Sequence, residues 1–250
     1  MCVFSPLSPC FLVPVSTKAM PPRYHATPPE AVAETVRETV FIDDRTFFIE
    51  RPTDPDRLFD HPFVRSAYVA DEYTPYWPTL WPSARMLAKV AVREPWDTYP
   101  QPVRVLEVGC GLGLAGVACL ARGLDVTFSD VDRTALAFAA RNAKHNGFSE
   151  KFRTIPLDFR CPPDDVKYPV VIGSDLMYEE RLVDPLVGLL AAVLAPGGVC
   201  LVTDPDRPSA RYFRWKLEEA GYAVTPEFIR AGEPGGERTK GTLYRIRHAG

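Results

Sequence analysis

The sequence has no excess of basic residues, no long apolar run and no cysteine pairing motif. Its 250 residues include 29 Lys and Arg against 32 Asp and Glu, a formal net charge of −3, which excludes a strongly basic nucleic-acid-binding protein. No stretch of about 18 apolar residues occurs, and this excludes a transmembrane helix. The six cysteines show neither CxxC nor Cys/His ligand spacing. We therefore expect reduced thiols in a cytoplasmic protein, without a metal site or a disulfide framework.

Proline, in contrast, is abundant, with 26 residues, and its densest run lies within residues 1–30. This segment shows neither helical nor strand periodicity, so we predict a disordered leader. The leader has no basic residue before its apolar stretch, and Pro9 and Pro14 interrupt that stretch, which argues against a signal peptide. Whether translation starts at Met1 or at Met20 is left open.

Residues 31–73 are predicted to form an N-terminal β-hairpin and a connector. Two β-rich runs flank Asp43 and Asp44, which is a hairpin pattern, and a polar stretch with several prolines follows to residue 73. The aromatic segment 75–82, PYWPTLWP, then leads into a helical pattern over 83–92. We place the main domain at residues 74–250.

From residue 103, short apolar runs alternate with amphipathic helical patterns. The runs cover residues 103–108, 125–128, 153–155, 169–172 and 198–203. This alternation indicates an α/β fold with βαβ crossovers and a doubly wound parallel sheet. After a helix near 208–220, two more strand-like runs follow with no helix between them. They must pair antiparallel, so the sheet ends in a C-terminal hairpin.

The segment 105–116, VLEVGCGLGLAG, is the most informative. It reads as a buried strand that enters a glycine-rich turn and then a helix. Gly109, Gly111 and Gly113 let the backbone turn tightly and approach a ligand. Because Gly111, Gly113 and Gly116 also satisfy GxGxxG, an NAD-dependent oxidoreductase has to be weighed as a rival.

Acidic residues near this loop favour S-adenosylmethionine over a dinucleotide. Glu107 would repel a doubly charged pyrophosphate and attract the cationic amine and sulfonium of S-adenosylmethionine. Asp130, at the end of the second strand, is placed to accept hydrogen bonds from the ribose hydroxyls of either ligand. After the third strand, Asp158 is expected to accept from the adenine amino group, and Phe159 to form an apolar wall against the ring.

From about residue 73 to its end, the chain resembles seven-β-strand S-adenosylmethionine-dependent methyltransferases. More narrowly, it resembles the protein lysine methyltransferase group that includes the electron-transfer flavoprotein β-subunit and chaperone lysine methyltransferases. The resemblance rests on EVGCGLG, on LWPSA at 80–84 and on DLMY at 175–178. It implies the strand order 3-2-1-4-5-7-6 with the last inserted strand antiparallel, and a place for Trp81 in the cofactor pocket. The group often carries Trp where this chain has Phe159.

Asp175 and Tyr178 follow the fourth strand and should face the transferred methyl group, because ligands bind beyond the carboxyl ends of such strands. A lysine, with a pKa of about 10.4, must lose its proton before it attacks. We assign Asp175 the tasks of attracting the ammonium and orienting the amine. Tyr178 is assigned an aromatic wall or a cation–π contact. Leu176 and Met177 replace the two prolines of methyltransferases that act on planar nitrogens, which argues against adenine or glutamine as the acceptor.

These patterns predict an enzyme that N-methylates a lysine of a protein substrate, with no nucleic-acid or membrane partner. An enzyme that methylates a small-molecule amine is one alternative function. A non-catalytic module that only binds the cofactor is another. Arg207, Arg211 and Arg214 are expected on an exposed helix face. Tyr76 and Trp77 are expected either to border the substrate entrance or to pack against the sheet edge.

Overall fold

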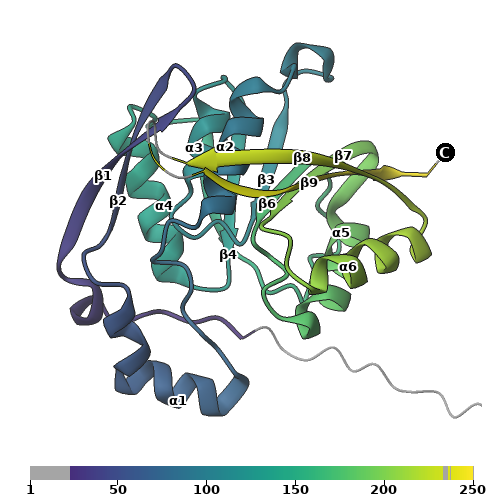
Figure 1. Ribbon diagram of the computed structural model, residues 1–250. Helices are drawn as coiled ribbons and strands as arrows, with labels where there is room; N and C mark the ends of the chain where they lie inside the picture. The colour runs from purple at the N-terminus through teal and green to yellow at the C-terminus, as the bar shows by residue number, and fades with distance from the viewer. Residues whose placement is uncertain (1–22, 233–235, 237, 250) are drawn as a thin grey trace, which may run out of the picture.

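The computed structural model describes residues 23–232, 236 and 238–249 and is built on a seven-stranded sheet (Figure 1). The strand order is β5-β4-β3-β6-β7-β9-β8. Strand β9 is antiparallel to both of its neighbours, and the other neighbouring strands are parallel. The strands are β3 (Arg104–Val108), β4 (Asp125–Asp130), β5 (Phe152–Pro156), β6 (Tyr168–Ser174), β7 (Leu194–Asp204), β8 (Tyr222–Gly232) and β9 (Arg238–His248). The predicted topology is confirmed.

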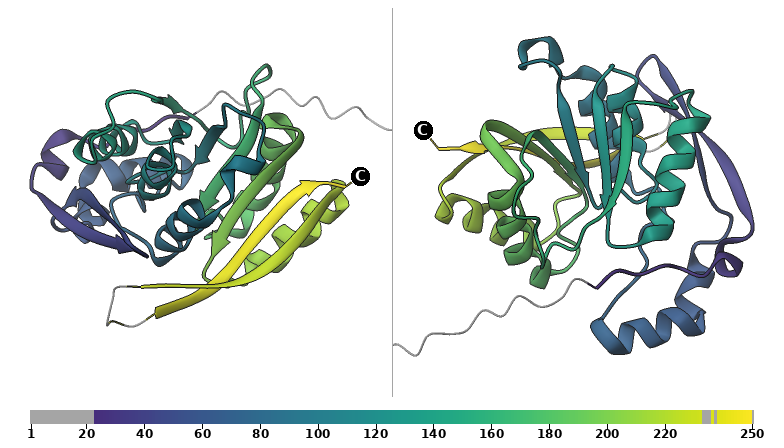
Figure 2. Two further views of the ribbon diagram at one scale, coloured as in Figure 1. Left: turned by 90° about the horizontal axis from the view of Figure 1, so that it is seen from above. Right: turned by 180° about the vertical axis from the view of Figure 1, so that it is seen from behind.

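Helices cover both faces of the sheet, as the view from above in Figure 2 shows. Along β3, Val105 belongs to the apolar core on one face, whereas Leu106 and Val108 belong to the core on the other. Since side chains alternate between the faces of a strand, both faces of the sheet are buried. The first core holds α2 (Pro82–Arg93), α3 (Leu114–Leu120) and α4 (Arg133–His145), and the second holds α5 (Val183–Val193) and α6 (Ser209–Glu219).

The predicted N-terminal hairpin is present as β1 (Thr35–Ile42) and β2 (Arg45–Pro52). Its inward-facing apolar residues join the core that contains α2, α3 and α4. The Asn142 side chain, on α4, accepts a hydrogen bond from the Glu50 backbone N–H at 2.7 Å and donates to its carbonyl at 3.1 Å. The Asn142 amide thereby pairs with backbone groups on the free edge of β2, which would otherwise remain unpaired.

The connector after the hairpin contains a helix that the sequence analysis did not predict. Helix α1 (Pro62–Asp71) projects from the body of the protein next to the N-terminal segment (Figure 1). Pro62 occupies the first turn, where its missing N–H is not needed. Only Val64 and Ala67 of this helix are buried. The short 3₁₀ helices are η1 (Pro29–Val32), η2 (Asp56–Asp60), η3 (Trp96–Thr98) and η4 (Glu180–Leu182).

The predicted leader falls largely on residues 1–22, which lie outside the described residues. Residues 23–30, which the prediction grouped with the leader, run along the main domain near the end of β4. None of the helices in the described part of the chain has the length and apolarity needed to span a bilayer.

We expect Ile49→Ala to lower the free energy of unfolding by about 2–4 kcal/mol, because it leaves a cavity in the core shared by the hairpin and α4. Ile49 is fully buried, whereas the neighbouring Phe48 is 41% exposed. Phe48→Ala is therefore the matched control and should change stability by less than about 1 kcal/mol. Chemical denaturation measures both. If both variants lost the same free energy of unfolding, the hairpin would not unfold together with the core of the domain.

Candidate functional site

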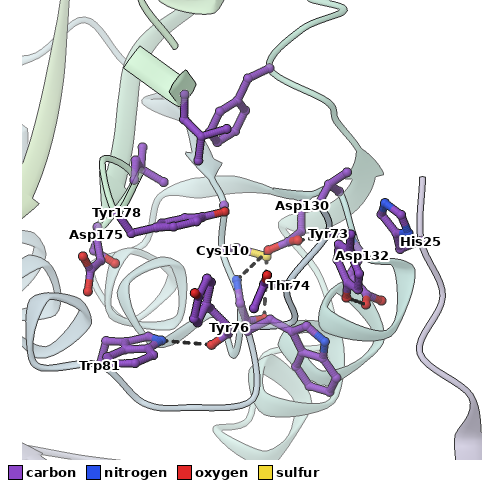
Figure 3. A pocket seen from close by; sticks show the side chains of 18 of the residues that line it. His25, Tyr73, Thr74, Tyr76, Trp81, Cys110, Asp130, Asp132, Asp175 and Tyr178 are labelled. Carbon is purple, nitrogen blue, oxygen red and sulfur yellow. Dashed lines mark hydrogen bonds between the residues drawn. The ribbon is translucent and has the colours of Figure 1, made fainter. Parts of the chain in front are cut away.

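A cavity opens at the carboxyl ends of the parallel strands. Loops after β3, β4, β5 and β6 line it, and residues between 71 and 84 contribute to its wall. Figure 3 shows Asp175 and Tyr178 at one end, Asp130 between, and His25, Tyr73 and Asp132 at the other end. The predicted site residues that line the cavity are Trp81, Gly109, Gly111, Gly113, Asp130, Asp158, Phe159, Asp175 and Tyr178. They meet because neighbouring parallel strands end at the same edge of the sheet.

The glycine loop after β3 uses backbone conformations that other residues rarely adopt. Gly109 and Gly113 have φ of +59° and +79°. A Cβ atom at Gly109 would lie 2.8 Å from the Leu176 side chain, and one at Gly113 would lie 2.8 Å from Cβ of Ala139. Both the backbone angle and the close packing therefore require glycine. The loop presents bare backbone to the cavity.

Glu107 is the one predicted site residue that does not line the cavity. Its side chain is buried at the end of β3, where Oε2 accepts a hydrogen bond from the Gly116 N–H at 2.9 Å. Burial raises the pKa of Glu107 to about 8, against the lowering effect of the Gly116 hydrogen bond, and the charge of Asp130 adds to the rise. The structure thus places Glu107 beneath α3, where it holds the first turn of that helix against β3.

Asp130 ends β4 and faces the middle of the cavity. Its Oδ2 accepts a hydrogen bond from the Gly111 N–H at 2.9 Å, and its Oδ1 accepts one from the Asp132 N–H at 3.0 Å. Burial raises the pKa of Asp130 to about 6, although these backbone hydrogen bonds oppose the rise. Asp130 therefore links the glycine loop to the loop after β4.

Asp132, which the sequence analysis missed, anchors three further segments. Its carboxylate caps α4 by accepting the Thr134 N–H at 2.6 Å. It also accepts hydrogen bonds from the Thr27 hydroxyl at 2.7 Å and from the Tyr73 hydroxyl. The N-cap could have been found in the sequence, since Asp132 directly precedes the helical pattern. Its contacts with Thr27 and Tyr73 join residues far apart in the chain, which no local pattern indicates.

We expected Asp158 to accept a hydrogen bond from the adenine amino group, but it already accepts hydrogen bonds from two arginine residues of the protein. Nε of Arg160 lies 2.8 Å from its Oδ1, and Nη2 lies 2.8 Å from its Oδ2. The Arg23 N–H donates to Oδ2 at 3.1 Å. Burial alone would raise the pKa of Asp158, but the hydrogen bonds from Arg160 and Arg23 bring it below its usual value. Phe159 lies in the wall beside it, as expected for an apolar side chain there.

The end of the cavity next to β6 contains Asp175, which forms an ion pair with Arg207. Nε of Arg207 donates to Oδ1 of Asp175 at 2.5 Å. The prediction that Arg207 belongs to an exposed helix face was wrong, because α6 begins only at Ser209. Arg207 lies in the turn after β7, where its N–H donates to Asp204 at 2.6 Å. That turn brings the guanidinium back to the end of β6.

Three aromatic side chains line the cavity at the same end as Asp175. The ring centroids of Tyr178 and Tyr76 are 4.9 Å apart, those of Tyr76 and Trp81 are 6.2 Å apart, and both pairs meet edge to face (Figure 3). The indole N–H of Trp81 donates to the Tyr76 carbonyl at 2.9 Å, which fixes the orientation of Trp81. Tyr76 therefore belongs to the cavity wall. Trp77 contributes to the wall but is mostly buried against Phe138.

Comparison with protein families matches residues 76–217, more than half of the chain, to the family described as lysine methyltransferase. Among curated proteins, the electron transfer flavoprotein beta subunit lysine methyltransferase of Xenopus laevis is 27% identical over 64% of this chain and 70% of its own length. The ubiquinone biosynthesis O-methyltransferase of Psychrobacter arcticus is 30% identical over 44% of this chain. This match spans less than half of that protein, 43% of its length.

Solved structures share the fold at low sequence identity. A glycopeptide N-methyltransferase complexed with S-adenosyl-L-methionine has a TM-score of 0.52 at 15% identity and covers 64% of this chain and 93% of its own. The ribosomal protein L11 methylase of Lactobacillus delbrueckii subsp. bulgaricus has a TM-score of 0.52 at 21% identity, with 66% and 78% covered. The family match spans the glycine loop and the segment 175–178, and these structures share the fold. The chain therefore belongs to the lysine methyltransferase family and has the class I fold that binds S-adenosylmethionine.

Proposed function

We propose that this protein transfers a methyl group from S-adenosylmethionine to the side-chain amine of a lysine in a protein substrate. The observation that supports the acceptor best is the combination of Asp175 with the rings of Tyr178, Tyr76 and Trp81 at one end of the cavity. A carboxylate attracts an ammonium group, and aromatic faces stabilise a cation that carries methyl groups.

The acidic lining of the cavity fits S-adenosylmethionine. Carboxylates of Asp71, Asp130 and Asp158 line the half of the cavity away from Asp175, and the guanidinium of Arg160 is paired with Asp158. Such a wall accepts hydrogen bonds from ribose hydroxyls and from an amino group, and it disfavours a doubly charged pyrophosphate. The acidic wall, together with the family match, favours a methyltransferase over an NAD-dependent oxidoreductase.

S-adenosylmethionine supplies a methyl group on a positively charged sulfur. The task left to the protein is to align a neutral amine with that methyl group, so that the nitrogen–carbon bond forms as the carbon–sulfur bond breaks. Arg207 holds Oδ1 of Asp175. We assign Oδ2, which accepts no hydrogen bond from the described residues, to the acceptor nitrogen. Asp175 then orients the lone pair, and the proton of the ammonium leaves to water before transfer.

The acceptor class is tested by incubating a cell lysate with the full chain and radiolabelled S-adenosylmethionine, followed by mass spectrometry of the labelled bands. We expect label on a protein, at methylated lysine residues. A Tyr178→Ala, Asp175→Asn double variant serves as the blank. Label found only in small metabolites would support the small-molecule alternative and overturn the protein acceptor. Cofactor binding without any transfer would support the non-catalytic module.

Asp130 is the residue we assign to the ribose hydroxyls. We expect Asp130→Ala to weaken the binding of S-adenosylhomocysteine by about 1–3 kcal/mol, through the loss of hydrogen bonds to the ribose and of the link to Gly111. Isothermal titration calorimetry measures the change. Unaltered affinity would remove Asp130 from the binding site.

The pKa of Asp130, raised by burial to about 6, adds a pH dependence. Ribose hydroxyls donate to the ionised carboxylate, so the affinity for S-adenosylhomocysteine should increase as pH rises through about 6, by up to about tenfold between pH 5 and pH 7. Asp130→Asn cannot ionise and should lose this increase. An equal pH dependence in the Asn variant would assign it to another group.

Asp175 is expected to act on the acceptor and not on the cofactor. Because Asp175 has a φ of +55°, Asn is the conservative substitution, since it tolerates this conformation better than Ala. Asp175→Asn should leave the affinity for S-adenosylhomocysteine within about twofold and lower kcat by about tenfold or more. Asp206→Asn, at another positive φ of +64°, is the matched control and should keep full turnover. Full turnover in Asp175→Asn would refute the assigned role.

A further inference from the structure

Arg207 pairs with Asp175 but is not among the residues that line the cavity. Its Nε donates to Oδ1 of Asp175 at 2.5 Å, and Asp175 lines the cavity with a side chain that is only 8% exposed. A ligand in the cavity therefore contacts the carboxylate of Asp175, whereas the charge of the guanidinium reaches that ligand only through space. The ligand meets a carboxylate whose charge is partly offset.

The turn that carries Arg207 is fixed at both of its ends. The Arg207 N–H donates to Oδ1 of Asp204 at 2.6 Å, and Asp204 is fully buried at the end of β7. At the start of α6, the Ser209 hydroxyl donates to the carbonyl of Met177, in the segment that follows Asp175. Because the backbone is held on both sides of Arg207, the guanidinium stays directed at Asp175.

The charges of Arg207 and its two acidic neighbours are coupled. The hydrogen bond to Asp175 raises the pKa of Arg207 above its usual value, although burial opposes the rise. Burial raises the pKa of Asp204 to about 6, and the charge of Asp175 adds to this rise, whereas the N–H and the charge of Arg207 oppose it. The guanidinium is therefore a permanent cation next to two carboxyl groups.

Arg181, which lines the cavity near Tyr178, already has acidic partners of its own. Its Nη1 lies 3.0 Å from Oε2 of Glu72, and its Nε donates to Glu179. These neighbours offset the charge of Arg181. Among the described residues, the cation that is paired with Asp175 is therefore Arg207.

Methyl transfer to a lysine places two demands on Asp175 that conflict. The carboxylate has to attract the amine, but a carboxylate without a counter-charge also stabilises the ammonium form, which cannot attack. We propose that Arg207 is a positioning residue that fixes Oδ1 of Asp175 and offsets its charge, so that Oδ2 holds a neutral amine without stabilising the ammonium. The inference rests on the proposed role of Asp175 at the acceptor nitrogen.

Sinefungin tests this inference without an acceptor protein. This analogue of S-adenosylmethionine carries an amine, cationic at neutral pH, in place of the transferred methyl group, and S-adenosylhomocysteine has no group there. The ratio of the two affinities, sinefungin over S-adenosylhomocysteine, therefore measures how strongly the site stabilises a cation beside Asp175. Isothermal titration calorimetry on the full chain gives both affinities.

The two members of the pair should change this ratio in opposite directions. Arg207→Gln should raise it by about threefold or more, because the carboxylate then meets the amine without a counter-charge. Asp175→Asn should lower it by about tenfold or more, because the carboxylate is lost and the guanidinium is left to repel the amine. Arg207→Lys keeps the positive charge and should stay within about twofold of the wild-type ratio.

The matched control is Arg211→Gln, which removes the same charge from an exposed position on α6 and should keep the wild-type ratio. A mere loss of folding weakens both ligands together and cannot raise the ratio. If Asp175→Asn lowers the ratio but Arg207→Gln lowers it or leaves it unchanged, the role of Arg207 is wrong and that of Asp175 stands. An equal rise in Arg207→Lys would also overturn the inference. An unchanged ratio in Asp175→Asn would overturn the proposed role of Asp175 itself.

Discussion

Two buried carboxylates at the end of β4 hold the loops of the site together. Asp130 ties the glycine loop to the loop after β4 through backbone N–H groups. Asp132 ties α4 to Thr27 and to Tyr73. Buried carboxylates are stable only when hydrogen-bonded, so each of these contacts is required by the burial of its acceptor. The path of the N-terminal segment and of the chain after α1 depends on this pair.

Arginine side chains pair with carboxylates at both ends of the cavity. At the end next to β5, Arg160 donates to both oxygens of Asp158. At the end next to β6, Arg207 donates to one oxygen of Asp175, and the rings of Tyr76 and Tyr178 lie nearby. Each arginine holds a carboxylate in a fixed orientation. Which carboxylate oxygens are taken and which are left decides where a ligand can donate a hydrogen bond.

The framework of the site could be predicted because it depends on local patterns. The glycine loop, the carboxylate at the end of each strand and the aromatic segment with Trp81 are all visible as short runs of residues. Arg207 was misplaced because a position shortly before a helix resembles the helix itself. Helix α1 was missed because it is short and lies in a polar connector with several prolines, although Phe63, Val64, Ala67 and Tyr68 follow helical spacing.

The sequence by itself determined the alternation of strands and helices, the hairpins and the set of residues at the strand ends, since backbone geometry and side-chain periodicity act over a few neighbours. Only the tertiary structure decided that Glu107 lies beneath the cavity, that Arg207 reaches Asp175, and that His25 and Asp71 join the wall. Such contacts connect segments separated by many residues. Their partners follow from how helices and loops pack on the sheet and from the cost of leaving a buried charge without a hydrogen bond.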